Sequence, residues 1–238
     1  MIKVEIACNG YASAVNALNG GADRIELFEN LPDGGCTPSA GMIQKATTLS
    51  LPCYVMIRPR GGNFVYTKDE IDIMLLDIDL CKNMSMAGIV FGCLTRSGEV
   101  DTVLNKMLME AWGNRSATFH RAIDRSSDPL KAAYAIADLG FERILSSGGA
   151  TNVSEGLDTL KKMQRDIGHA IIVMPGAGVT ANNAKQILDY TGCREIHATC
   201  KKTLASSNGN SRFLSETVQV SDEDEIASLV RQAGKVAE

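Results

Sequence analysis

The sequence predicts an α/β fold, a single (β/α)8 barrel of the TIM type that spans residues 1–238 as one domain. Short β-branched runs alternate with amphipathic helical segments eight times along the chain. Strands separated by helices pair in parallel, because a parallel pair needs a crossover connection. The length of 238 residues also suits an eight-unit barrel, which typically has about 250. A doubly wound open sheet is the alternative, but no segment has the different character expected of its edge strands.

Eight short segments have the apolar, β-branched composition of buried parallel strands. Turn residues or helical segments flank each of them, which sets their length. In chain order they cover residues 2–7, 23–27, 53–57, 87–92, 116–120, 142–146, 170–176 and 195–199.

A segment with helical periodicity follows each predicted strand, and several have recognisable ends. Ser39 is a predicted N-cap, Thr67 and Glu70 have the spacing of a capping box, and Asp128 precedes Pro129 at a first turn. The predicted helical segments cover residues 12–21, 39–49, 67–84, 100–112, 128–140, 152–168, 180–192 and 221–235.

One long segment lacks either pattern. Residues 203–221 are polar and contain Gly, Ser and Asn. Such a stretch inside a regular fold predicts a mobile loop over the barrel mouth, before the C-terminal helix.

Charge and cysteine usage exclude several classes of function. The net charge of −4 argues against binding to nucleic acids or anionic membranes. No apolar run approaches the roughly 20 residues of a membrane span, and the N-terminus lacks the pattern of a secretory signal. The seven cysteines are odd in number and show no paired metal-ligand spacing. We therefore expect reduced thiols and a cytoplasmic location.

Polar and ionisable residues gather in the predicted strands or just after them. Active sites of such barrels lie at the carboxyl ends of the strands, and a charge inside a strand is costly unless it is paired or solvated. The residues converging on that mouth, in chain order, are Glu5, Cys8, Glu26, Arg58, Arg60, His120, Arg121, Ser147, Gly176, Gly178, His197 and Lys201.

Two interpretations of the ionisable residues stay open. Glu26, His120 and His197 form a candidate catalytic set, since carboxylate and imidazole groups suit proton transfer near neutral pH. Alternatively, Glu5, Glu26 and Arg58 fill the barrel as a buried ion network, and His120 is a core histidine with satisfied hydrogen bonds.

The stretch "IRPRGG" predicts an anion site. Arg58 and Arg60 have alternate spacing, so both side chains can point to one side, and arginine binds anions bidentately. The turn 176–178 precedes a helix N-terminus, which also attracts anions. Strands three, five and seven contribute to the same barrel layer, so we expect these groups to meet beside His120. Further candidate ligands of the anion are Arg121, Ser147 and Lys201.

The motifs "GGADRIEL", "GGCTPS", "VMIRPRGGNF", "FGCLTRSGEVD", "TFHRAID", "RILSSGG", "MPGAGV" and "EIHAT" occur here in the order seen in the CutC copper-homeostasis family. The chain resembles this family from Glu5 to about Thr203. The resemblance implies a TIM-type barrel, a cytoplasmic location and an association with copper homeostasis. It also implies homo-oligomers, often dimers, and copper binding, as Cu(I), by some members.

The sequence departs from the family where copper matters. Members proposed to bind copper carry cysteines at the positions of Ala7 and Phe28, and thiolates are the ligands that Cu(I) prefers. Only Cys8 lies nearby, and a lone thiolate is a weak metal ligand. A copper site of the two-cysteine type is therefore not expected.

Three hypotheses of function follow. The first is a CutC-like protein associated with copper homeostasis that binds copper weakly through Cys8. The second is an enzyme that acts on a small anionic molecule, phosphorylated molecules included, by His/Glu acid–base chemistry. The third is a noncatalytic scaffold. The first two are compatible, because a barrel enzyme can affect copper tolerance indirectly.

Overall fold

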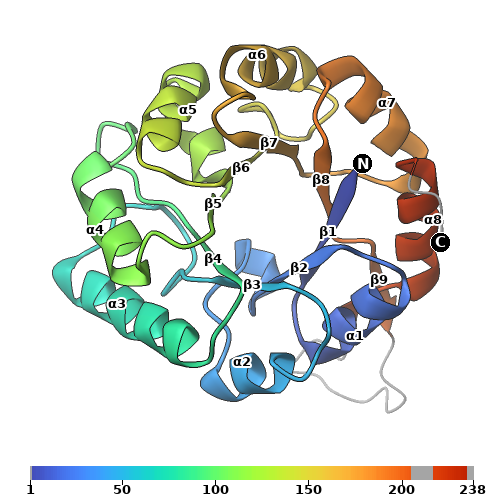
Figure 1. Ribbon diagram of the computed structural model, residues 1–238, viewed down its shortest axis with the longest axis horizontal. Helices are drawn as coiled ribbons and strands as arrows, with labels where there is room; N and C mark the ends of the chain where they lie inside the picture. Colours follow the sequence, from blue (N-terminus) through green and yellow to red (C-terminus); the bar gives the residue numbers. More distant parts are fainter. Residues whose placement is uncertain (1, 205–216, 235–238) are drawn as a thin grey trace.

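Eight parallel strands form a nearly closed barrel in the computed structural model, which describes residues 2–204 and 217–234 (Figure 1). Each strand pairs with the next from β1 to β7, and β1 also pairs with β8. The (β/α)8 prediction is confirmed. The strands are β1 (Lys3–Cys8), β2 (Arg24–Leu27), β3 (Cys53–Met56), β4 (Gly88–Phe91), β5 (Ala117–Phe119), β6 (Arg143–Ser146), β7 (Ile172–Pro175) and β8 (Glu195–Ala198).

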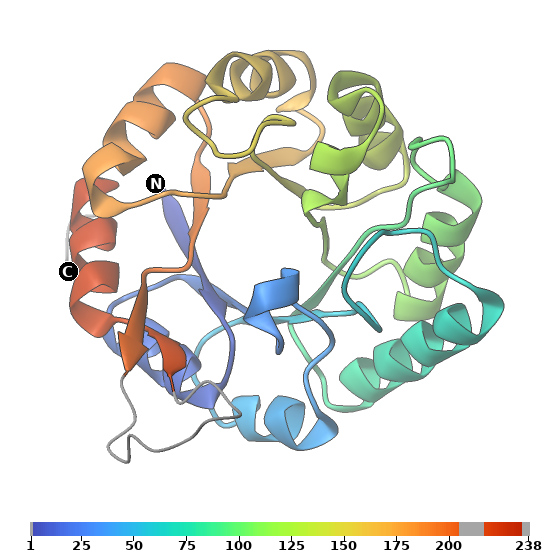
Figure 2. The same ribbon diagram turned by 180° about the vertical axis from the view of Figure 1, so that it is seen from behind.

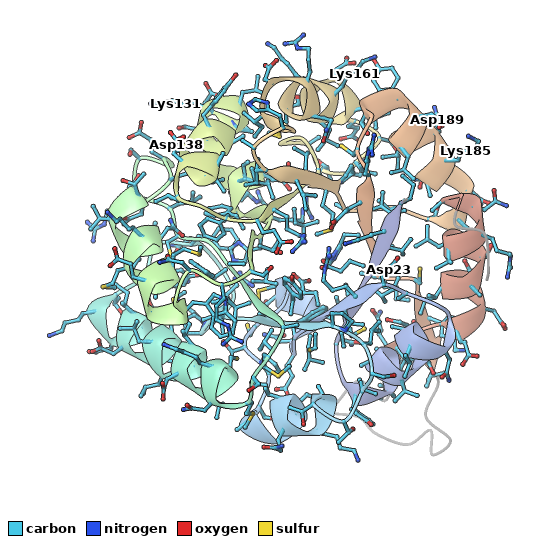
Figure 3. The ribbon with its side chains drawn as sticks, viewed as in Figure 1. Asp23, Lys131, Asp138, Lys161, Lys185 and Asp189 are labelled. Atoms are coloured by element: carbon cyan, nitrogen blue, oxygen red, sulfur yellow. The ribbon has the colours of Figure 1, made fainter. Side chains whose placement is uncertain are left out.

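Helices form the outer ring around the strands (Figure 1). They are α1 (Tyr11–Asn19), α2 (Ala40–Ala46), α3 (Lys68–Asn83), α4 (Thr102–Trp112), α5 (Pro129–Asp138), α6 (Leu157–Ile167), α7 (Ala181–Thr191) and α8 (Glu223–Gln232). Figure 3 shows Lys131, Lys161 and Lys185 on the outer rim of this ring, where the charged side chains meet solvent. Among the described residues, none of the helices combines the length and the apolar character that crossing a membrane requires.

The predicted helix caps are present. Ser39 Oγ accepts the Met42 N–H, and Thr67 and Glu70 form the reciprocal capping box. Asp128 Oδ1 accepts the N–H groups of Leu130 and Lys131. These local contacts satisfy backbone donors that have no partner inside the helix.

One helix begins later than its periodicity predicts. The segment 152–168 was expected to be helical throughout, but α6 starts at Leu157. Residue 156 ends the β6–α6 loop and lies against the start of that loop, where a Cβ would be 1.7 Å from the Ser147 carbonyl oxygen. Gly156 permits that approach, and the preceding residues turn instead of forming helix.

The predicted loop 203–221 begins and ends in strands. β9 (Lys201–Leu204) and β10 (Val218–Ser221) pair antiparallel, and residues 205–216 of the predicted loop lie outside the described residues. The Ser221 N–H donates to Ser13 Oγ at 3.0 Å, and Asn9 Nδ2 donates to the Gln219 carbonyl at 3.0 Å. The hairpin is therefore fixed beside α1, as Figure 2 shows.

Strand side chains alternate between two environments. Ile6, Cys8 and Leu27 belong to the apolar core between strands and helices. Because successive strand residues point to opposite faces, Ala7 and Glu26 point into the barrel instead. This interior is polar at its centre, where buried charged and imidazole side chains lie: Glu5, Arg24, Glu26, Arg143, Glu195 and His197.

Candidate functional site

Buried ion pairs occupy part of the barrel interior. Arg24 pairs with Glu5 and, at 2.6 Å, with Glu195, while Arg143 Nε lies 3.1 Å from the same Glu195. The guanidinium carbon of each arginine lies 5.1 Å from the centre of the Tyr54 ring. Glu5 thus belongs to a buried ion network, as one of the two interpretations held. The other members, Arg24, Arg143 and Glu195, were missed, although each lies in a predicted strand and their charge was the available signal.

His197 connects this network to Glu26. His197 Nδ1 lies 2.8 Å from Glu5 Oε1, and its Nε2 lies 3.7 Å from Glu26 Oε2. Burial opposes ionisation of Glu5, but Arg24 and His197 hold its pKa far below the ordinary value. Burial likewise opposes the charged imidazole, but Glu26 and Glu5 raise the pKa of His197.

Glu26 has the properties of a proton-transfer group. Burial raises its pKa from 4.5 to about 7, with His197 acting in the opposite direction. Its Oε1 atom is buried and has no hydrogen-bond partner among the described residues. Glu26 can therefore take up and release a proton near neutral pH.

A cavity of about 970 Å³ opens from the carboxyl ends of the strands. Its volume suits a small ligand. The short helix η1 (Leu31–Asp33) contributes to its wall and lies over the barrel opening in Figure 2. Its walls include apolar residues and the ionisable groups Glu26, Arg58, His120, Arg121 and His197.

His120 presents one ring nitrogen without a partner. Its Nδ1 accepts the Ala122 N–H at 3.3 Å, whereas Nε2 is buried and has no hydrogen-bond partner in the described part of the chain. Burial, together with the Arg58 charge, lowers the pKa of His120 to about 3. The ring is thus neutral, and with Nδ1 accepting, the proton lies on Nε2. The core-histidine interpretation therefore holds for Nδ1, which has a hydrogen-bond partner, but not for Nε2.

Arg58 is a buried cation without an anionic partner. It is 3% exposed, and its guanidinium donates to the carbonyls of Asp33, Gly35 and Gly62. It forms no ion pair with any described residue, and its Nε–H has no acceptor. The alternative in which Arg58 pairs with Glu5 or Glu26 is therefore wrong.

The sequence predicted that the side chains of Arg58 and Arg60 point to the same side, but Arg60 lies outside the cavity. Its Nε donates to Glu70 Oε1 at 2.5 Å, and Nη2 donates to the Val65 carbonyl at 2.9 Å. The side chain is thereby tied to its own loop and to the N-terminus of α3.

The loops after β5 and β6 meet around Asp124. This carboxylate accepts from Arg121 Nε at 2.8 Å, from the hydroxyls of Ser146 and Ser147, and from the Gly149 N–H at 3.1 Å. Arg121 is the first residue of the short helix η2 (Arg121–Arg125), and its side chain lines the cavity. Ser147 does not line it, since its hydroxyl is held by Asp124 and by the Ala150 carbonyl at 2.6 Å.

The structure does not bring the turn 176–178 to Arg58. The Gly176 N–H donates to the Ser146 carbonyl at 2.9 Å, and the Ala177 carbonyl accepts the Val153 N–H at 2.8 Å. These contacts direct the turn toward the neighbouring loop, so neither Gly176 nor Gly178 lines the cavity. Lys201 lies in the exposed strand β9 and is also outside it.

The residues present do not fit a thiolate copper site. Ala7 and Phe28, at the positions of the family cysteines, line the cavity with apolar groups. Cys8 is buried on the helix side of β1, its Sγ donates to the Ile6 carbonyl at 3.4 Å, and burial raises its pKa. Among the described residues, no group of three or more His, Cys, Asp or Glu side chains is arranged to hold a metal ion.

The chain is a (β/α)8 barrel with a cavity at the carboxyl ends of its strands, the end at which barrels of this fold place their sites. The sequence identifies the family of the protein, since the profile of the CutC family matches residues 2–202. The chain belongs to the CutC family.

Relatives of this family are similar over most of their length. The human copper homeostasis protein cutC homolog is 43% identical over 201 residues, which cover 84% of this chain and 74% of the relative. The CutC family protein of Parabacteroides distasonis is 42% identical over 205 residues, covering 85% and 84%. The crystal structure of CutC from Streptococcus agalactiae has a TM-score of 0.80 at 34% identity, covering 84% of this chain and 99% of that one.

Proposed function

We propose that the protein is an enzyme that binds a small anionic molecule through Arg58 and transfers protons with Glu26. Arg58 is the observation that carries the proposal. A buried guanidinium without a carboxylate is costly, and a bound anion would supply the missing charge. The other proposed roles are donation of a hydrogen bond by His120 Nε2 and positioning of Glu26 by His197. A noncatalytic scaffold gives no reason for these unpaired groups in one cavity.

Positive charge at the cavity mouth also favours an anion. Arg96 and Arg125 line the cavity, are exposed and form no ion pair with the described residues. They would attract an anion from solution, whereas Arg58 would bind it inside.

Phosphate is expected to raise the melting temperature of the parent protein. At a hundredfold excess over its dissociation constant a ligand adds about 2.7 kcal/mol, or roughly 5–10 °C for a chain of this size. Arg58→Met should lose the phosphate-induced rise, and its lower melting temperature without phosphate should reflect the three released carbonyls. Thermal melts with and without phosphate measure both effects.

Arg60→Met is the matched control, because Arg60 lies two residues further along and binds Glu70 instead of the cavity. It should keep the phosphate-induced rise. A parent protein that phosphate does not stabilise would count against the anion site.

An association with copper homeostasis, which the name of the human relative states for that protein, is proposed here as indirect. It would act through the ligand of the cavity and not through a copper ion held by two thiolates. The cytoplasmic location and the homo-oligomeric state expected from the sequence stay predictions.

A Cu(I) competition titration tests this part of the proposal. Because the Cys8 thiol faces the apolar core, the parent and Cys8→Ser proteins are both expected to leave the metal with a strong Cu(I) chelator. Stoichiometric binding by the parent would contradict this expectation, and its loss in Cys8→Ser would identify Cys8 as a ligand.

A further inference from the structure

We infer that the reaction of this cavity is removal of a proton from a carbon atom next to a carbonyl group, in a substrate that also carries a carboxylate or a phosphate. The inference rests on the proposed function and names its substrate class. Three groups define it: the Glu26 carboxylate as base, the His120 Nε2–H as donor to the carbonyl oxygen, and the Arg58 guanidinium as partner of the anionic group.

Glu26 is placed to act on a carbon acid. Its Oε1 atom has no partner among the described residues, and apolar groups of Ala7, Phe28 and Met56 line the same cavity. A carboxylate in such surroundings is poorly solvated and therefore a stronger base. Its other oxygen faces His197 Nε2 at 3.7 Å, which holds the carboxylate in place.

His120 is placed to stabilise the charge that develops on oxygen. With Nδ1 accepting the Ala122 N–H, the free Nε2 carries a hydrogen atom. His120 directly follows β5. In the barrel order β5 lies three strands from β2, which carries Glu26. A substrate in the cavity can therefore meet the base on one wall and the donor on another. A fixed, neutral donor is suited to an enolate oxygen.

Other routes to a carbanion or an acyl intermediate lack their residues in this cavity. No lysine lines it among the described residues, so a Schiff base has no attachment point there, and the described walls contain no serine or cysteine nucleophile. Of the two threonines that line it, Thr95 is hydrogen-bonded to Ser97 at 2.8 Å. The acid–base pair is what the described walls supply.

The step balances without a further reactant. Glu26 removes the proton, the C–H electron pair forms the new carbon–carbon double bond, and the carbonyl electrons move onto oxygen. That oxygen accepts the His120 hydrogen bond. The proton on Glu26 exchanges with solvent, and Glu26 then returns a proton to the same carbon, which restores the carbonyl group and regenerates the carboxylate.

Hydrogen exchange in D2O tests the inference with two probes, dihydroxyacetone phosphate for a phosphate and 2-oxobutyrate for a carboxylate. Proton NMR is expected to show the protein speeding the loss of the C–H signal next to the carbonyl in at least one of them. The probe that exchanges identifies the anionic group. No catalysed exchange in either probe would overturn the inference.

Variants assign the exchange to the named groups. Glu26→Gln should slow it by about 10²–10⁴-fold and His120→Leu by about 10²–10³-fold. Arg58→Met should raise the half-saturating probe concentration. Glu110→Gln removes an exposed carboxylate of α4 and should change nothing. Exchange at the parent rate in Glu26→Gln would overturn the assignment of the base to Glu26.

Failure of this inference differs from failure of the proposed function. If phosphate stabilises the parent but neither probe exchanges, the anion site stands and the carbon-acid reaction is wrong. If phosphate does not stabilise the parent, the anion site itself is wrong.

Discussion

Replacing Arg24 by methionine is expected to lower the free energy of unfolding by about 3–5 kcal/mol, because it removes the cation from a buried ion network. Arg24 is 5% exposed and contacts two carboxylates, those of Glu5 and Glu195, which are 1% and 5% exposed. Methionine fills similar space but leaves Glu5 with only His197. Urea unfolding of parent and variant measures the loss.

An exposed ion pair provides the control for Arg24. Arg165 pairs with Asp166 at 2.6 Å, and its side chain is 68% exposed. Arg165→Met should change the free energy of unfolding far less than Arg24→Met, because solvent screens a surface pair. Equal losses in the two variants would show that the interior network does not hold the barrel together.

At pH 8 the Glu26→Gln variant is expected to be more stable than the parent by on the order of 3 kcal/mol, a shift from 4.5 to about 7 at roughly 1.4 kcal/mol per pH unit. The pKa of Glu26 is higher in the folded than in the unfolded chain, so the folded chain binds more protons between these values. The contribution of Glu26 to the free energy of unfolding is fully present below pH 4.5 and is lost as the pH rises through 7. Glutamine does not titrate and avoids that loss.

Urea unfolding from pH 4 to pH 8 follows this difference directly. The two proteins should be close in stability near pH 4 and diverge as the pH rises, with Glu110→Gln following the parent throughout. A difference that does not depend on pH would mean that Glu26 is not the titrating group. The expected gain in Glu26→Gln means that the Glu26 carboxylate lowers the stability of the parent protein. A loss of stability of this kind is typical of functional sites.

The sequence predicted the fold well, because the signals for strands and helix ends are local. Thr67 and Glu70 lie three residues apart, and Asp128 precedes its own helix, so no distant contact was needed to recognise them. Gly156 shows where this fails. Its role depends on the approach of the Ser147 carbonyl from the start of the same β6–α6 loop, which helical periodicity does not reveal.

Site residues inside or directly after strands were predicted better than those in loops. Glu26, His120 and His197 share the cavity because alternation along a strand fixes where each side chain points. Arg60 lies beyond the end of β3 at Met56, where alternation no longer applies, and Glu70 captures it. The pair Arg24–Glu195 joins residues 171 positions apart, so their contact could not be predicted from spacing.

The most direct test of the anion site is a crystal structure of the protein grown with selenate, a tetrahedral dianion whose selenium can be located by anomalous scattering. We expect a selenium peak inside the cavity, with an anion oxygen within hydrogen-bond distance of Arg58, and no such peak in Arg58→Met. A fully occupied cavity peak that persists in Arg58→Met, or selenate bound only at the turn 176–178, would contradict it.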